Sequence, residues 1–183
     1  EVRLNHSAVE LQRALYPEHY GRYDARTDIQ WADAADSLIE NFWRVQGDTI
    51  LHVLSELSGI AWSERGMDLY VLRYFPSLGS PDPLVIPVGG MRRGELIESA
   101  PSGKVMKLNV IYQLARRMLD QPPGAGMEGL SNHQLMRPGE YRRDNLALLL
   151  AVATAEQVIG VDSARDAWQS AFWRNHFPAI EVF

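Results

Sequence analysis

The sequence predicts an α+β fold that is mainly helical, with a small antiparallel or mixed sheet packed on a central helix. Apolar residues recur at helical spacing before residue 60 and again after residue 103. Between these helical parts lie short segments rich in Val, Ile, Leu and Tyr, bounded by Gly and Pro. The length of 183 residues suits one domain. We expect an N-terminal arm at 1–26, a core at about 27–160, and a C-terminal helix and tail at 161–183.

Composition narrows the function classes. A hydrophobic content of 46% and a charged content of 22% are ordinary for a globular protein with its own core. A net charge of −5 argues against general nucleic-acid binding, and no apolar run reaches the roughly 18 residues of a membrane span. The absence of cysteine excludes disulfides and thiolate metal sites. We therefore expect no nucleic-acid or membrane partner and a soluble protein, with the cytoplasm slightly favoured over export; the oligomeric state stays open.

The first helical part begins at a capping box, Thr27-Asp-Ile-Gln30, in which Thr27 would cap the helix and Gln30 would reach back. Apolar residues then follow one face as far as Val45. Gly47 is a point where the helix could be interrupted, before the periodicity resumes and ends at Gly59. Two helices and one long bent helix both fit this pattern.

Three strands are predicted next. Met67–Phe75 is rich in apolar and aromatic residues and ends at Pro76. After a Ser, Gly and Pro turn, Leu84–Val88 forms a second strand, and Pro87 indicates an edge position for it. Glu95–Ile97 could add a third strand.

Three helices complete the chain. The central one follows Ser102-Gly103 and ends before Pro122, and a loop covers 121–138. Tyr141–Ile159 is apolar nearly all round in its middle, so we expect it to be the most buried element. A last helix would be capped by Asp162 or Ser163.

The central helix carries the pattern of greatest functional interest. Tyr112 and Arg116 are four residues apart, with Gln113 next to Tyr112. A zinc-peptidase helix has His-Glu-x-x-His at this spacing, with two metal ligands and a general base. An ordinary amphipathic helix with no such ancestry explains the pattern equally well.

The order of segments resembles the minimal gluzincins, a family of small zincin-like metallopeptidase domains. The resemblance covers roughly residues 40–160 and rests on a helix, the strand Asp68–Tyr74, a Gly/Pro turn, a second strand and the helix of Tyr112 to Arg116. In that family a strand edges the substrate cleft, the zinc helix lies behind it, and a following helix supplies a further ligand. The resemblance implies that Tyr112 and Arg116 stand at the two histidine positions and Gln113 at the catalytic glutamate.

These substitutions remove the family's chemistry. A phenol is a poor zinc ligand at neutral pH, and arginine stays protonated and repels a cation. Glutamine cannot accept a proton from water as a carboxylate can. The resemblance therefore implies a pseudopeptidase without metal, cofactor or catalytic residues.

The remnant of the cleft would include side chains of the following helix, namely Glu140, Asp144 and Asn145, beside Tyr112, Gln113 and Arg116. A partly buried guanidinium needs a counter-charge. We therefore expect Arg116 to pair with Asp144 or Glu140 at the former metal position.

Arginine pairs offer another hypothesis. Arg116, Arg142 and Arg143 could converge on the cleft and bind an anion through paired hydrogen bonds, although solvated surface charge is the ordinary interpretation. The five histidines are scattered, and His52 with Glu56 is better explained as a satisfied pair than as a metal site.

The favoured function is thus a non-catalytic zincin-like domain that binds a peptide or protein partner in the remnant cleft. The partner would add a strand along the edge strand 68–74. Two alternatives remain: a hydrolase with an unrecognised site, for instance Glu140, Asp144 and His133, and a structural domain that associates through its Trp-rich helices.

Overall fold

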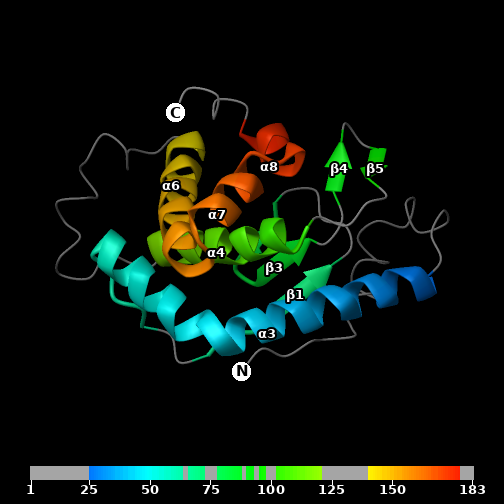
Figure 1. The fold of residues 1–183 in the computed structure, drawn as a ribbon, viewed down its shortest axis with the longest axis horizontal. Helices are drawn as coiled ribbons and strands as arrows, with labels where there is room; N and C mark the ends of the chain where they lie inside the picture. Colours follow the sequence, from blue (N-terminus) through cyan, green and yellow to red (C-terminus); the bar gives the residue numbers. More distant parts are fainter. Residues whose placement is uncertain are drawn as a thin grey trace.

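The computed structural model confirms an α+β fold that is mainly helical (Figure 1). It describes residues 25–63, 66–72, 78–87, 90–92, 95–97, 102–120 and 140–177, with side chains except at 25–32, 90–92, 95–97 and 140–142. The helices are α3 (Ala25–Ser58), α4 (Gly103–Asp120), α6 (Glu140–Ile159), α7 (Val161–Trp168) and α8 (Ala171–His176). The strands are β1 (Leu69–Leu72), β2 (Ser80–Pro81), β3 (Leu84–Pro87), β4 (Gly90–Arg92) and β5 (Glu95–Ile97). Most of the predicted arm and the predicted loop at 121–138 lie outside the described residues.

The first helical part is one continuous helix, α3, of 34 residues. Gly47 lies inside it, where a Cβ atom would come within 2.9 Å of Cε2 of Trp43. The helix ends at Gly59, whose φ of 70° and N–H bond to the Ser55 carbonyl fit the predicted left-handed end. The predicted start is wrong: α3 begins at Ala25, so Thr27 lies within the first turn and not at the cap. Ala25 and Arg26 are strong helix formers, and they extend the helix by two residues on the N-terminal side of the capping box.

The three-stranded sheet is mixed. Its order is β1-β3-β2, with β1 parallel and β2 antiparallel to β3, and Leu69 pairs with Leu84. The edge position predicted from Pro87 is wrong, because β3 is the central strand and all four of its residues are buried. Pro87 is the last residue of β3, where a missing N–H interrupts no further pairing. The predicted strand at 95–97 is confirmed as β5, which pairs with β4 in a separate ladder.

The core surrounds α4. Helices α3, α6 and α7 and strands β2 and β3 all contact it, and Figure 1 shows it between α6 and the sheet. Leu108, Ile111, Leu114 and Met118 of α4 are completely buried. The helix α6 is therefore not the most buried element, contrary to expectation, because it is covered on fewer sides and leaves Leu149 52% exposed.

The C-terminal part contains two short helices where one was predicted. Gly160, with φ 87°, precedes α7, so neither Asp162 nor Ser163 is the cap and both lie in the first turn. The chain becomes extended at Ser170 and α8 follows. This break directs Trp173 into the core, where it is completely buried. Among the described residues, no helix is both long enough and apolar enough to cross a membrane.

Candidate functional site

The helix α4 presents Tyr112 to the C-terminal helix. The Tyr112 side chain is only 2% exposed, and its ring packs edge-on against Trp173 and Phe177 with centroid distances of 5.2 and 5.7 Å. Burial raises the pKa of the Tyr112 phenol well above its ordinary value, and the charge of Asp144 and a hydrogen bond to Asp144 add to this rise, while Arg116 opposes it. The phenol is therefore held in its neutral form.

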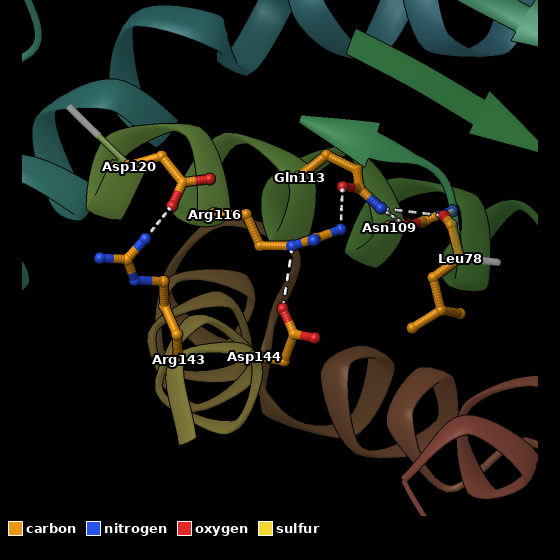
Figure 2. A network of polar contacts seen from close by, with 7 residues as sticks. All are labelled: Leu78, Asn109, Gln113, Arg116, Asp120, Arg143 and Asp144. Carbon is orange, nitrogen blue, oxygen red and sulfur yellow. Dashed lines mark hydrogen bonds and ion pairs between the residues drawn. The ribbon is translucent and has the colours of Figure 1, made fainter. Parts of the chain in front are cut away.

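Gln113 is bonded on both ends of its amide. Its Nε2 donates to the Leu78 carbonyl at 2.9 Å and to Oδ1 of Asn109 at 3.3 Å, and its Oε1 accepts from Nη1 of Arg116 at 3.3 Å. Nδ2 of Asn109 donates to the same Leu78 carbonyl at 2.9 Å. Figure 2 shows this chain of contacts along α4. Because both amides are completely or almost completely buried, they fix residue 78 against the helix.

Gly79 allows this close approach. A Cβ atom at residue 79 would lie 2.1 Å from the Val85 carbonyl oxygen and 2.9 Å from Nε2 of Gln113. Its φ of 125° also lies in a region that favours glycine. The backbone next to β2 therefore packs directly on the polar face of α4.

Arg116 pairs with Asp144, one of the two partners that the sequence predicted. Nε of Arg116 lies 3.0 Å from Oδ1 of Asp144, and the guanidinium carbon lies 5.7 Å from the centre of the Tyr112 ring. The two side chains are 26% and 40% exposed, so this pair is partly screened by solvent. Figure 2 shows Asp144 reaching Arg116 from the first turns of α6.

A cavity of about 420 Å³ opens beside this pair. Four of the six residues predicted for the cleft line it, namely Tyr112, Arg116, Asp144 and Asn145. Gln113 is bonded next to it without lining it, and the side chain of Glu140 lies outside the described residues. Opposite α4 and α6, the cavity is lined by Leu78–Pro81, His176 and Phe177.

Sequence reasoning missed this second wall. Ser80 falls in a turn cluster, and His176 looked isolated because nothing in a single sequence links the chain's C-terminal end to residue 112. His176 is exposed, and its Nδ1 lies 2.8 Å from the Phe172 carbonyl oxygen. One sequence feature could have pointed to this wall. The aromatic residues Phe172, Trp173 and Phe177 are close together in the sequence, which suggests that the C-terminal helix packs on the core.

The predicted convergence of arginines is not seen. Arg143 does not line the cavity; its guanidinium bonds to Oδ1 of Asp120 at 2.6 Å, and Figure 2 shows this contact. Arg116 is occupied by Asp144 and Gln113. The side chain of Arg142 lies outside the described residues. Arg116 of α4 is therefore paired with a carboxylate of α6, and Arg143 of α6 is paired with a carboxylate of α4.

The donor set does not fit zinc. Structural and catalytic zinc sites use neutral imidazole, carboxylate or thiolate ligands. Here the phenol is held neutral, the amide of Gln113 is bonded on both ends, and Arg116 contributes a positive charge. Within the part of the chain that the structure describes, no group of three His, Asp or Glu residues lies close enough to hold a metal ion. His52 and Glu56 form an exposed pair at 3.4 Å.

The strand predicted to receive a partner lies away from this cavity. Within the described sheet β1 is an edge strand, but β3 separates it from β2, and the residues next to β2 line the cavity. The cavity and the β1 edge that was predicted to receive a partner are therefore two separate surfaces. Of the alternative hydrolase set, Asp144 is paired with Arg116, while His133 and the side chain of Glu140 lie outside the described residues. Comparisons with protein-family models, with curated proteins and with solved structures gave no match.

Proposed function

We propose that this chain is a non-catalytic, zincin-like domain that binds a peptide or protein segment in the cavity between Leu78–Pro81 and the helices α4 and α6. The observation that carries the proposal is the bonding of Gln113, Arg116 and Asp144. The residues at the motif positions are used to hold the fold together, yet a cavity remains beside them. A site without the motif's glutamate and its two histidine ligands suits peptide binding better than zinc-dependent hydrolysis.

The lining suits a peptide. Leu78, Pro81 and Phe177 give apolar surface, while Ser80, Asn145 and His176 supply polar groups that can bond to a peptide backbone. A volume of about 420 Å³ is within the usual range of binding clefts, which combine an apolar lining with a few polar groups. The charges of Arg116 and Asp144 cancel, so we expect the site to select by shape and backbone bonding more than by ligand charge.

Strand addition at β1 is the competing mode of binding, since β1 has an unpaired edge within the described sheet. The absence of native cysteine allows both modes to be tested in one experiment. Single cysteines at Asn145, in the cavity, and at Asp68, just before β1, would each carry a photo-crosslinker. Both positions are exposed, so labelling should leave the core intact.

The labelled proteins would be exposed to a pool of extended peptides of varied sequence and then irradiated. We expect crosslinked peptides at position 145 and few at position 68. Crosslinks confined to position 68 would place the partner on β1 and reject the cavity. Equal, sequence-independent labelling at both positions would reject a specific peptide site.

A further inference from the structure

A second hollow lies at the other end of α4 and concentrates one residue type. The sequence contains two lysines among its 18 Lys and Arg residues. Both of them, Lys104 and Lys107, line this groove of about 730 Å³. Lys104 and Lys107 are on the first turns of α4, where the helix dipole adds positive potential. Lys104 is paired with Asp166, so the local positive charge of this groove comes mainly from Lys107, on a chain with a net charge of −5.

The groove has an apolar floor between helices. Leu38, Phe42 and Val45 of α3 form one side, and Val158 and Ile159 at the end of α6 form the other. Val45 is 69% exposed, the most exposed of the four large exposed hydrophobic residues in the described part. Residues 37–46 of α3 line the groove over about 14 Å, using the rise of about 1.5 Å per residue.

The charged residues that line the groove are both positive. Among the described residues that line it there are two lysines and no carboxylate. Asp36 and Glu40 of α3 point to the other side of that helix, because they are about half a turn away from Leu38 and Phe42.

The two lysines differ in their partners. Lys104 bonds to Asp166 at 2.8 Å, but both side chains are at least half exposed, so this pair is weak and easily exchanged. Nζ of Lys107 lies 5.3 Å from the centre of the Phe42 ring, and no carboxylate of the described part pairs with it. Lys107 is therefore the cation most available to a ligand.

We propose that this groove binds an acidic amphipathic helix of a partner protein. Two helical walls, an apolar floor and a length of roughly two and a half helical turns match the helix-in-groove mode of recognition. The apolar face of the partner helix would cover the exposed Val45 and the half-buried Val158 and Ile159. Its Glu or Asp residues would pair with Lys107 and displace Asp166 from Lys104. This surface is independent of the cavity at Arg116, so it does not rest on the function proposed above.

The two lysines allow a direct test on the full chain. Reductive methylation with ¹³C-formaldehyde keeps the lysine charge and gives NMR signals from only two side chains, Lys104 and Lys107, and from the N-terminal amine. The probe is a 14-residue peptide with Leu at helical spacing and Glu on both flanks, and its control has Lys in place of each Glu. We expect the acidic peptide to shift both lysine signals and the Lys-rich peptide to shift neither.

Variants separate the groove from the rest of the surface. The substitution Lys107→Glu should weaken binding of the acidic peptide about tenfold, and Val45→Asp should weaken it at least as much, because each removes one half of the complementarity. The matched control is Leu149→Asp, which changes another exposed hydrophobic residue outside the groove and should leave the affinity unchanged. Raising the salt from 50 to 500 mM should weaken the acidic peptide several-fold.

Three outcomes would overturn the proposal. Unshifted lysine signals at millimolar acidic peptide would show that the groove is closed or unsuited to a helix. Equal affinity of the acidic and Lys-rich peptides would show apolar association without charge recognition. Lysine shifts that depend on protein concentration in the absence of peptide would identify a second copy of the chain as the occupant.

Discussion

The two ends of α4 use their charged residues in opposite ways. From the middle of α4 toward its C-terminal end, Arg116 and Asp144 face each other, and the Gln113 amide is bonded to the backbone at residue 78, as is Asn109 one turn earlier. Toward the N-terminal end, Lys107 lies over the Phe42 ring, no carboxylate among the described residues pairs with it, and the exposed Val45 lines the same groove. Polar groups that are bonded internally stabilise one arrangement of the fold, whereas unpaired charge beside apolar surface is available to a partner. Substitutions should therefore affect stability at the first end and binding at the second.

The largest effect is expected at Gly79. The substitution Gly79→Ala places Cβ against the Val85 carbonyl oxygen and adds backbone strain, so we expect a loss of at least about 3 kcal/mol in unfolding free energy. Urea denaturation followed by circular dichroism measures this loss. The control is Gly59→Ala, which has a positive φ but no atom within 4 Å of the new Cβ, and it should cost about 1–2 kcal/mol. Equal losses at the two glycines would mean that backbone strain alone, without the close approach to β3, explains residue 79.

The next effect is expected when Gln113 is replaced by glutamate, the acid that the zinc-peptidase motif has at this position. In Gln113→Glu the carboxylate cannot donate to the Leu78 carbonyl, and it lies beside that oxygen in a completely buried place. We expect a loss of about 1–3 kcal/mol at pH 7, as for an unsatisfied buried acceptor. Thermal and urea unfolding would measure it. An unchanged or higher stability would mean that attraction to Arg116 outweighs the lost bond. The bond from Gln113 to the Leu78 carbonyl would then not be what stabilises this part of the fold.

Tyr112 should make stability depend on alkaline pH. Its pKa is raised in the folded state, so above the unfolded pKa of about 10 the unfolded chain releases a proton that the folded chain retains. The stability contribution is complete below that pH and is lost as pH rises, at up to about 1.4 kcal/mol per pH unit. Urea unfolding between pH 8 and 11 should show a smaller decline for Tyr112→Phe than for the unchanged protein. Parallel declines would contradict the assigned burial and bonding of the phenol.

The Arg116–Asp144 pair should give a smaller coupling. A double-mutant cycle with Arg116→Met and Asp144→Asn is expected to yield up to about 1 kcal/mol, because both side chains are partly exposed. The same cycle for Arg143 and Asp120, which are 53% and 43% exposed, should give less. The reverse order would mean that closeness of contact, 2.6 against 3.0 Å, outweighs burial.

The smallest effect is expected in the groove. The variants are Lys107→Met and Val45→Thr. Lys107→Met removes a charge above the Phe42 ring but keeps an unbranched apolar side chain there, and Val45 is 69% exposed, so we expect changes within about 0.5 kcal/mol of the unchanged protein. Losses above that range in urea unfolding would show that the groove is part of the stabilising core, and the contrast between the two ends of α4 would fail.

Local pattern predicted much of this molecule. The α+β class and the helices of α3, α4 and α6 follow from apolar periodicity, and Gly59 ended its helix as expected because its left-handed conformation is a local property. The position of a strand within the sheet does not follow from local sequence. Pro87 suggested an edge position for β3, but β3 pairs with both β1 and β2 and is therefore the central strand. The break between α7 and α8 likewise depends on the burial of Trp173 against Tyr112, a contact between distant segments.

The site was predicted in part for the same reason. Arg116 and Asp144 were nominated together because a partly buried cation requires a carboxylate, and this requirement holds whatever the surrounding fold. Gly79, Ser80 and His176 could not be nominated, since their roles depend on where β2 and α8 meet α4. The predicted anion site stays a prediction: Arg143 pairs with Asp120 at the end of α4 and so does not join Arg116, while the side chain of Arg142 lies outside the described residues.

The most direct test of the central claim is the fate of peptides held in the cavity. A peptide pool would be equilibrated in zinc-containing buffer with the unchanged protein, with Asn145→Trp, which fills the cavity, and with Leu149→Trp, one turn further along α6. Mass spectrometry would then compare bound and unbound peptides. We expect the unchanged protein and Leu149→Trp to enrich the same intact peptides and Asn145→Trp to enrich none. Cleaved peptides that appear with the unchanged protein but not with Asn145→Trp, or enrichment that survives Asn145→Trp, would contradict a non-catalytic binding cleft at Arg116.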